Sequence, residues 1–538
     1  MLLGLATTVW DEGPQMQGGT IYNAAADLIE RNLAAGRGGK PAFIDDRGQY
    51  SYAEIAERVS RFANVVRRLG VHPEQRILLC LHDTIDFPTA FLGAIKAGVV
   101  PVAVNTQLSP EEFAFMLADS RARVVIVSAP VLPAMTAALA QLPVPRPTVI
   151  VSGDMPGEGS LDDLLAAAPV TSETAPTHPD EPCFWLYSSG STGRPKGTVH
   201  IQSSLIGTAE LYAIPVLGIA ESDVSFSAAK LFFAYGLGNS LTFPMAVGAT
   251  SVLMAERPTP AAVGRVLREH RPTIFYGVPT LYNAMLASND LPQPEELALR
   301  RCVSAGEPLP AEIGRRWSAR IGVDILDGIG STELLHIFLS NRPEAVRYGT
   351  TGKPLPGYPL AIVDEEGRPA PRGKVGDLLV SGPTSAAGYW NNRERSRTTF
   401  NGLWTRTGDK YFEDEDGYYV YCGRSDDMLK VSGMYVSPAE VEAALIAHED
   451  VLEAAVVGAA DDDGLIKPKA FVVVKPGIGA DDELARALDQ HAQRMLAPFK
   501  CPRWIAFLDE LPKTATGKIQ RFKLRETSSS PPRPAEPA

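Results

Sequence analysis

The sequence predicts a large multi-subdomain α/β protein with a small α+β domain at its C-terminal end. Three observations support this prediction. Between Tyr22 and Leu299, apolar runs such as RILLCL and RVVIVS alternate with amphipathic helical stretches, which is typical of buried parallel strands covered by helices. After about Gly352, short β-type segments separated by glycine and acidic turns indicate a more β-rich subdomain. From VSPAEVEAAL onward, helical segments alternate with the strand-like runs EAAVVGA and PKAFVVVKPG.

Length and composition limit the possible classes of protein. The 538 residues are several times the length of one domain, and hydrophobic residues make up 45% of them. No apolar run reaches the ~18 residues that a membrane span needs, so no membrane partner is expected. The opening MLLGLATTVWDEG has no basic start and is interrupted by Asp11 and Glu12, which argues against a secretory signal. A cytoplasmic location is therefore expected.

Charge and cysteine usage exclude two further classes. The net charge of -12 comes from interspersed acidic residues, and such a surface repels nucleic-acid phosphate. The five cysteines lie far apart without a CxxC pair, so they are predicted to be buried thiols instead of zinc ligands or disulfide partners. They are Cys80, Cys183, Cys302, Cys422 and Cys501.

The chain is expected to divide into residues 1–20, a flexible N-terminus; 21–425, a large domain; 426–527, a small mobile domain; and 528–538, a disordered tail. The tail SSSPPRPAEPA has the composition of a disordered segment. The predicted boundary is the polar stretch Gly423–Asp427, which fits a hinge or a surface turn equally well.

A loop rich in glycine and hydroxyl groups, YSSGSTGRPKG, covers Tyr187 to Gly197. Glycines allow a backbone to approach phosphate closely, Ser and Thr supply hydroxyl donors, and lysine supplies charge. An ordinary cluster of this composition is more often a surface loop. It is not a Walker A loop, because Pro195 precedes Lys196 and Gly197 follows it.

This segment resembles the signature loop of the adenylate-forming superfamily, which contains acyl- and aryl-CoA synthetases, adenylation domains and luciferases. SAGEPLP, GIGSTE, TGD, GRSDDMLKVSG and PKTATGK follow in the order typical of the superfamily, so the resemblance spans about Tyr22 to Arg525. It implies that the large domain contains two α/β sheets and a β-rich subdomain, and that the small domain turns on a hinge.

Adenylation joins two anions, a carboxylate and ATP, so it requires a metal and cationic groups. By the resemblance, Thr332 contacts phosphate, Glu333 holds Mg²⁺, and Lys518 reaches from the small domain to the α-phosphate and the substrate carboxylate. These three are the candidate catalytic residues. The alternatives are that the Thr-Glu pair only begins a helix and that Lys518 is an exposed lysine near the end of the chain.

The resemblance also implies a nucleotide site in which Asp409 accepts hydrogen bonds from the ribose and Arg424 assists. Ile329 departs from the superfamily pattern, because many members carry an aromatic ring against the adenine at this position; apolar packing replaces it here. The candidate ATP-binding residues are Ser188, Ser189, Gly190, Ser191, Thr192, Gly193, Lys196, Ser304, Ala305, Gly306, Glu307, Asp327, Gly328, Ile329, Gly330, Asp409 and Arg424.

The second half-reaction, in which a thiol replaces AMP, requires the lysine to leave first. Asp426 matches the hinge position of the superfamily. Gly433 would line the pantetheine tunnel, where a side chain would obstruct entry. Its alternative interpretation is an ordinary turn glycine.

The acid site is predicted from FFAYGLG, which begins at Phe232, and YGVP, which begins at Tyr276. Aromatic rings next to glycines suit a flat slot, although such a stripe is more often plain core. FWLYSSGSTGRPKGTVH and LDGIGSTELLHIFLSN resemble the benzoate-CoA ligase branch. The resemblance places Ala234, Tyr235, Gly236, Gly328, Ile329 and His336 around the acid. If the segment after Glu333 is helical, His336 lies at i+3 and can face the carboxylate; otherwise it is a polar core residue.

The predicted function is that of a benzoate-CoA ligase, which converts an aryl carboxylate, ATP and CoA to aryl-CoA, AMP and pyrophosphate through an aryl adenylate. Mg²⁺ is the expected cofactor, with ATP and CoA as co-substrates. The alternatives are an adenylation enzyme that loads a carrier protein and an inactive protein that binds nucleotide or aryl acid. A fatty acyl ligase is disfavoured because Tyr235 and His336 would crowd a long chain. Ring substituents, the pathway, and the choice between monomer and homodimer stay open.

Overall fold

The computed structural model describes residues 21–153, 159–188, 195–425, 427–431, 434–461, 465–513 and 519–528. The larger of two α/β sheets, sheet A, has the strand order β15-β14-β13-β12-β11-β9-β10-β1-β2. Its central pairs are parallel, whereas β2, β14 and β15 add antiparallel edges. Its strands are β1 (Pro41–Asp45), β2 (Gly48–Ser51), β9 (Val224–Ser227), β10 (Thr250–Val252), β11 (Ile274–Gly277), β12 (Arg301–Ser304), β13 (Ile325–Gly330), β14 (Ile337–Ser340) and β15 (Lys353–Pro354).

Sheet B has the order β18-β8-β7-β4-β3-β5-β6. Its parallel part contains the short apolar runs of the sequence, and β5 is buried along its whole length, as expected for strands covered on both faces. Its strands are β3 (Arg76–Cys80), β4 (Val100–Ala103), β5 (Val124–Ser128), β6 (Thr148–Ser152), β7 (Pro182–Ser188), β8 (Lys196–Ile201) and β18 (Gly388–Tyr389).

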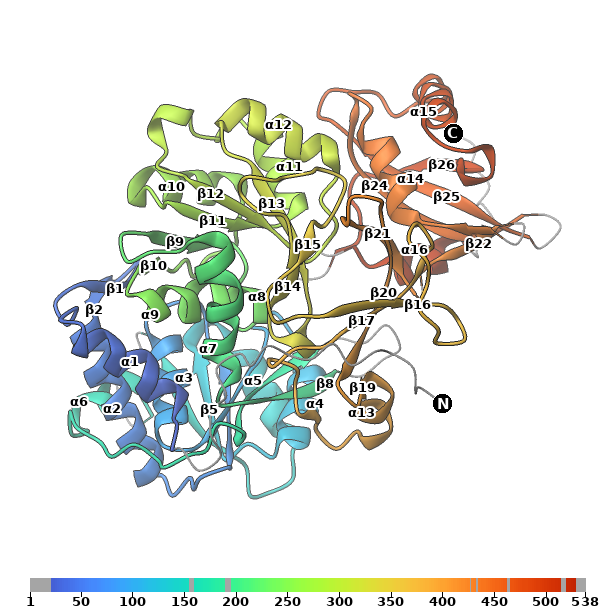
Figure 1. Cartoon of the computed structure of the whole chain (residues 1–538). Helices are drawn as coiled ribbons and strands as arrows, with labels where there is room; N and C mark the ends of the chain where they lie inside the picture. The colour runs from blue at the N-terminus through green and yellow to red at the C-terminus, as the bar shows by residue number, and fades with distance from the viewer. Residues whose placement is uncertain are drawn as a thin grey trace, which may run out of the picture.

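Helices fill the space between the two sheets and cover their outer faces (Figure 1). The helix that begins at Tyr52 shows why the sequence folds in this way. Ser51 accepts a hydrogen bond from the amide of Glu54, whose carboxylate accepts one from the amide of Ser51, so the first turn is capped. The helices of this part are α1 (Ala24–Ala34), α2 (Tyr52–Arg68), α3 (Asp86–Lys96), α4 (Pro110–Ser120), α5 (Leu132–Ala140), α6 (Leu161–Ala166), α7 (Ser204–Thr208), α8 (Ala234–Leu237), α9 (Phe243–Val247), α10 (Pro260–His270), α11 (Pro279–Ala287) and α12 (Ala311–Ile321).

The principal hydrophobic core contains residues of both sheets and of the helices between them. Phe91 of α3 and Phe184 of β7 meet edge to face, with ring centroids 5.4 Å apart. Two π-helical segments, Ala209–Leu217 and Gly238–Thr242, extend α7 and α8. The second of them continues directly from the segment predicted to contact the acid.

A third, antiparallel sheet, sheet C, follows Gly352, as the change in sequence pattern predicted. Its order is β16-β17-β20-β19, and β21 also pairs with β20. It contains β16 (Leu360–Val363), β17 (Gly376–Val380), β19 (Phe400–Asn401), β20 (Trp404–Glu413) and β21 (Tyr419–Arg424), with α13 (Arg393–Thr399) beside it.

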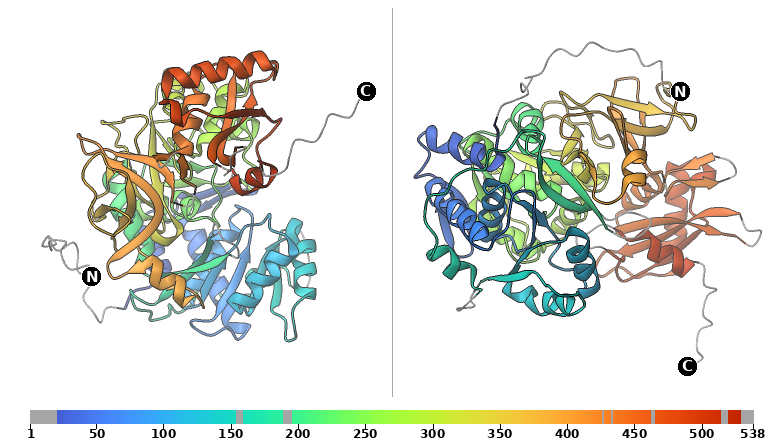
Figure 2. Two further views of the ribbon diagram at one scale, coloured as in Figure 1. Left: turned by 90° about the vertical axis from the view of Figure 1, so that its right-hand side faces the viewer. Right: turned by 90° about the horizontal axis from the view of Figure 1, so that it is seen from below.

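The C-terminal unit is a smaller α+β structure that lies to one side of the larger unit (Figures 1 and 2). Its core packs α14 and α15 on the sheet β24-β25-β26, and the hairpin β22-β23 joins that core. The elements are β22 (Leu429–Val431), β23 (Met434–Val436), α14 (Pro438–Ile446), β24 (Val451–Ala460), β25 (Ile466–Val474), α15 (Asp482–Met495), β26 (Trp504–Phe507) and α16 (Arg521–Ser528). The predicted fold class is thus confirmed: two α/β sheets, a β-rich subdomain and a small α+β unit.

All five cysteines lie in the described part of the chain. Cys80, Cys183, Cys302 and Cys422 are buried free thiols, as predicted, but the prediction was wrong for Cys501, which is partly exposed. It lies in a loop between a short 3₁₀ turn and β26, where solvent reaches it.

None of the described helices combines the length and apolar character that crossing a bilayer demands.

Candidate active site

The phosphate loop connects two antiparallel neighbours in sheet B. Ser188 ends β7 and Lys196 begins β8, and the two residues are paired across the hairpin. The candidates Ser189, Gly190, Ser191, Thr192 and Gly193 lie outside the described residues. The structure therefore places the two ends of the loop, and both ends lie beside a carboxylate.

That carboxylate belongs to Glu333. It lies on a short 3₁₀ turn, Thr332–Leu334, where the Ser331 hydroxyl accepts a hydrogen bond from the amide of Leu334. The Ser188 hydroxyl donates to Glu333 Oε1 across 3.4 Å, and the Tyr389 hydroxyl donates to the same oxygen across 2.7 Å. The phosphate loop, the 3₁₀ turn and β18 are brought together at this one oxygen atom.

Lys196 completes the cluster. Its Nζ atom lies 4.7 Å from the centroid of the Tyr389 ring, within the range of a cation–π interaction. Burial lowers the pKa of the Lys196 ammonium, and the negative charge of Glu333 opposes this effect. An ammonium, two hydroxyls and a carboxylate thus face one small region, a set that suits a metal–phosphate ligand.

A buried histidine, His200, holds the backbone of Thr332. Nε2 of His200 lies 2.8 Å from the carbonyl oxygen of Thr332 and donates to it. His200 is fully buried and stacks on Phe184 at 5.1 Å, and burial lowers its pKa to about 4. This neutral imidazole fixes the position of the turn that carries Glu333.

Sequence reasoning missed both Tyr389 and His200. His200 stands just after the phosphate loop, whereas Tyr389 lies in none of the motifs described above. A single aromatic residue or histidine is common in cores, so only the contact with Thr332 or Glu333 identifies it as part of the site.

The predicted ribose contacts lie together on neighbouring strands of sheet C. Asp409 on β20 and Arg424 on β21 are paired in register. Nη1 of Arg424 donates to Asp409 Oδ1 at 3.2 Å and to the carbonyl oxygen of Thr407 at 3.0 Å. Gly408 has φ +76°, and a Cβ atom there would lie 2.7 Å from Arg424 Nη2, so glycine is required at this turn. The Arg424 guanidinium thus holds the Asp409 carboxylate, which we expect to accept hydrogen bonds from the ribose hydroxyls.

The predicted adenine slot lies at the carboxyl ends of two parallel strands of sheet A. Ser304 on β12 is paired with Asp327 on β13, and Ala305, Gly306 and Glu307 follow Ser304. Asp327 Oδ1 and Ser304 Oγ are buried and have no hydrogen-bond partner among the described residues. Burial raises the pKa of Asp327 well above its ordinary range. Unpaired buried oxygens at this edge of a parallel sheet are typical of a ligand site.

The end of β13 carries the remaining candidates of this slot. A Cβ atom on Gly330 would lie 2.5 Å from the carbonyl oxygen of His336, and one on Gly328 would lie 3.1 Å from Ile337. Both glycines therefore allow β13 and β14 to approach closely. Ile329 packs against the principal core from a partly buried position.

The C-terminal unit reaches this slot. The amide of Ile519 donates a 3.2 Å hydrogen bond to Glu307 Oε1. Lys518 itself lies outside the described residues, as do Asp426 and Gly433. The residue that follows the candidate lysine therefore contacts the candidate adenine slot.

The candidate acid site lies where α8 meets the segment after Glu333. The rings of Tyr235 and His336 lie 5.6 Å apart, and Nε2 of His336 is 3.2 Å from the carbonyl oxygen of Tyr235. The Tyr235 hydroxyl is directed at the carbonyl oxygens of Gly277 and Val303, each 3.3 Å away. Burial lowers the pKa of His336 to about 3, so its ring is neutral. Both aromatic side chains are thus fixed by backbone carbonyls.

The segment after Glu333 is not helical. The 3₁₀ turn ends at Leu334, Leu335 has φ +67°, and β14 begins at Ile337. The left-handed backbone of Leu335 stops any helical continuation. His336 therefore does not have the i+3 spacing of a helix; it is a buried polar residue beside Tyr235.

The other acid-site candidates have different surroundings. Ala234 begins α8 and packs against the core from a partly buried position. A Cβ atom on Gly236 would lie 2.1 Å from the carbonyl oxygen of Lys230. Because it has no side chain, Gly236 allows the chain to fold back against the carbonyl group of Lys230.

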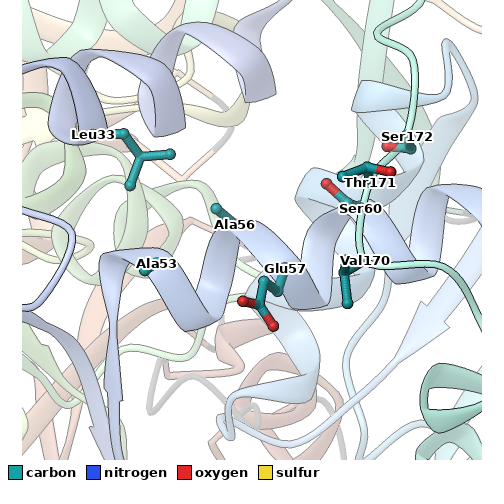
Figure 3. Close-up of a pocket in the computed structure, with 8 residues that line it drawn as sticks. All are labelled: Leu33, Ala53, Ala56, Glu57, Ser60, Val170, Thr171 and Ser172. Carbon is teal, nitrogen blue, oxygen red and sulfur yellow. The ribbon is translucent and has the colours of Figure 1, made fainter.

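A separate pocket of about 340 Å³ lies on α1, α2 and the segment 170–172, where Leu33, Ala53 and Val170 form part of its lining (Figure 3). It contains none of the candidate residues.

Among the described residues, no group of three or more His, Cys, Asp or Glu side chains is arranged to hold a metal ion.

Known proteins resemble this chain along nearly all of its length. The model of the AMP-binding enzyme family matches residues 30–390, and that of the AMP-binding enzyme C-terminal domain matches residues 440–518. Benzoate–CoA ligase of Thauera aromatica is 64% identical, covering 94% of this chain and 96% of the relative. The 4-hydroxybenzoate–CoA/benzoate–CoA ligase of Rhodopseudomonas palustris is 51% identical, covering 96% and 97%. The crystal structure of a benzoate CoA ligase from Burkholderia xenovorans LB400 has a TM-score of 0.89 and 55% identity, covering 94% and 100%.

Proposed function

The chain belongs to the AMP-binding enzyme family, and from this membership we propose that it is a benzoate–CoA ligase. It converts benzoate or a close aryl relative, ATP and CoA to the aryl-CoA thioester, AMP and pyrophosphate. The similarity to benzoate–CoA ligases extends over almost the whole chain and supports both the reaction and the acid.

One geometric relationship supports the chemistry. Glu333, at the phosphate cluster, and His336, at the acid site, are separated by a single reversal of the chain at Leu335. An aryl ring beside Tyr235 and His336 therefore places its carboxylate next to the phosphate cluster. That is the juxtaposition that attack on an α-phosphate requires.

In the first half-reaction, a carboxylate oxygen of the acid attacks the α-phosphorus of ATP, and the bond to pyrophosphate breaks. Ser188 and Lys196 bind phosphate oxygens, Asp409 binds the ribose, and the oxygens of Ser304 and Asp327 face the base. We assign to Lys518 the stabilisation of the negative charge that develops between the carboxylate and the α-phosphate.

Magnesium fits the oxygen ligands at Glu333. Mg²⁺ binds hard oxygen ligands and usually takes one or two protein carboxylates, with water and phosphate oxygens completing its shell. Glu333 supplies one carboxylate, and Oε1 is already held by Tyr389. A bound Mg²⁺ would neutralise part of the phosphate charge during adenylation.

In the second half-reaction, the sulfur of CoA attacks the carbonyl carbon of the adenylate, the thiol proton is released, and AMP leaves. We propose that the unit 426–527 turns about Asp426 relative to residues 21–425, which withdraws Lys518. Gly433 then lines the path of the pantetheine arm. The need for ATP and CoA favours the cytoplasm, and either a monomer or a homodimer suits the mechanism.

The test is the release of AMP and pyrophosphate with Mg-ATP across benzoate, aminobenzoates, hydroxybenzoates, cinnamates and fatty acids, each with and without CoA. Multiple turnovers that depend on CoA and are restricted to benzoates are expected. Thioester formation only on a carrier protein, or no reaction with any aryl acid, would contradict the proposal.

A further inference from the structure

A buried carboxylate holds the loop that carries the candidate acid site. Asp83 follows β3 of sheet B, and its side chain is almost completely buried. Both of its carboxylate oxygens accept from the amide of Leu231, Oδ1 at 3.1 Å and Oδ2 at 3.3 Å. Leu231 belongs to the loop after β9 of sheet A, so this contact joins the two sheets across 148 residues of sequence.

Lys230, which precedes Leu231 in the chain, supplies a positive charge that compensates for the carboxylate of Asp83. The ammonium of Lys230 donates to the carbonyl oxygens of Met254 and Glu256, the latter at 2.7 Å. Burial raises the pKa of Asp83 to about 6, and the positive charge of Lys230 opposes this rise. A buried carboxylate without a cation nearby would be strongly destabilising. The two charges therefore fix both Lys230 and Leu231 to surrounding structure.

The fixed end of this loop is in contact with the acid site. The amide of Phe233 donates to the carbonyl oxygen of Lys230 at 3.0 Å, and the amide of Leu237 donates to that of Phe233 at 2.8 Å. The same Lys230 carbonyl lies against Gly236, with no room for a side chain between them. Ala234 and Tyr235 lie inside this closed loop. A shift of Lys230 or Leu231 is consequently transmitted to Tyr235, which contacts His336.

We infer that Asp83 and Lys230 are positioning residues for the aryl acid: they hold the loop 230–237 so that Ala234 and Tyr235 form a rigid wall of the acid site. Neither residue is among the candidates for contact with acid or nucleotide. This inference rests on the proposed function, because it assumes that the acid binds beside Tyr235 and His336.

Asp86 offers a matched control. It is a second fully buried aspartate only three residues away, and it binds Arg47, Arg58 and Ser152 instead of the acid-site loop. Asp86→Asn therefore removes a buried charge near the same helix start without releasing Leu231. It is expected to lower the melting temperature and to leave the KM for benzoate unchanged.

The experiment compares wild type, Asp83→Ala, Asp83→Asn, Lys230→Met and Asp86→Asn. Steady-state AMP release at saturating CoA gives kcat and the KM for benzoate and for ATP, and thermal unfolding gives the melting temperature. Asp83→Ala and Lys230→Met are expected to raise the benzoate KM by about 10-fold, as for a lost buried hydrogen bond to a charged group. The KM for ATP is expected to stay the same. Asp83→Asn keeps an acceptor oxygen and the size of the side chain, so it should fold even if Asp83→Ala does not, with a smaller rise.

Two results would overturn the inference. One is a benzoate KM that is unchanged in both Asp83→Asn and Lys230→Met; the other is a rise in the KM for ATP equal to the rise for benzoate, which would indicate general damage. Failure of the wild-type chain to use benzoate would instead remove the proposed function and, with it, this inference.

Discussion

The hydroxyl of Tyr389 donates a 2.7 Å hydrogen bond to Glu333 Oε1, while the ring of the same tyrosine lies beneath the ammonium of Lys196. One side chain thus sets the distance between the cation and the carboxylate that we assign to phosphate and Mg²⁺. The Ser188 hydroxyl approaches the same oxygen from the phosphate loop.

Removing the Tyr389 hydroxyl should loosen Glu333 but leave the other side chains of the phosphate cluster in place. A hydrogen bond to a charged group contributes about 1.5–3 kcal/mol, so Tyr389→Phe is expected to slow adenylation by about 10-fold or more. The Mg²⁺ concentration at half-maximal rate should rise, and the benzoate KM should stay the same. Pyrophosphate release over a Mg²⁺ titration measures the first quantity, and its dependence on benzoate concentration measures the second. Tyr52→Phe is the control, since Tyr52 donates a buried 2.7 Å bond to the carbonyl oxygen of Ala249. Equal Mg²⁺ dependence in the two variants would contradict the role of Tyr389.

Lys518→Ala should nearly abolish adenylate formation while ATP still binds, because the transition-state charge loses its cation. Thioester formation from presynthesised adenylate should decrease much less. Single-turnover assays of each half-reaction separate the two effects. Lys513→Ala is the matched control, because Lys513 lies in the same motif but pairs with Glu453. Full adenylation activity in Lys518→Ala would disprove the assignment.

Asp409→Ala should weaken ATP binding by about 10-fold or more, since it removes the acceptor that Arg424 orients for the ribose. The benzoate KM should change little. Equilibrium binding of ATP and the KM for ATP are the measurements. Asp377→Asn tests specificity, because Asp377 is also on sheet C but binds Lys410 and Ser425. ATP binding reduced equally in both variants would indicate damage to the sheet.

His200 should make the fold sensitive to acid. Its pKa falls from 6.5 to about 4 on folding, so the unfolded state binds more protons between these values and stability decreases as pH falls through them. The contribution amounts to up to about 3 kcal/mol of unfolding free energy. His200→Gln keeps a donor for Thr332 and should lose less stability between pH 6.5 and pH 4, as measured by denaturant unfolding. Asp83 titrates with the opposite sign, so the difference between wild type and variant isolates His200. Parallel pH curves for the two proteins would refute the prediction.

Much of this protein could be predicted from its sequence because the relevant information is local. Strand-length apolar runs alternating with amphipathic helices predicted the sheets, and the change of pattern after Gly352 predicted sheet C. Short motifs carry their chemistry within a few residues. The composition of the phosphate loop indicated Lys196, and the resemblance of the motifs around Glu333 and Asp409 to those of the superfamily indicated these two residues. Cys501 was predicted wrongly, and whether a helix follows Glu333 was left open, since loop exposure and the left-handed backbone of Leu335 have no signature in residue type.

Tertiary structure alone decided the contacts that hold these residues. Tyr389 is 56 positions from Glu333, His200 is 132 positions from Thr332, and Asp83 is 148 positions from Leu231. No local pattern encodes such pairs, because they depend on how the edges of the sheets meet after packing. The sequence by itself therefore determined which chemical groups the site contains, whereas the packing of the sheets determined which buried hydrogen bonds hold them in place. The physical reason is that residue type fixes chemistry, but a hydrogen bond requires two atoms within about 3 Å, and only the folded chain sets that distance.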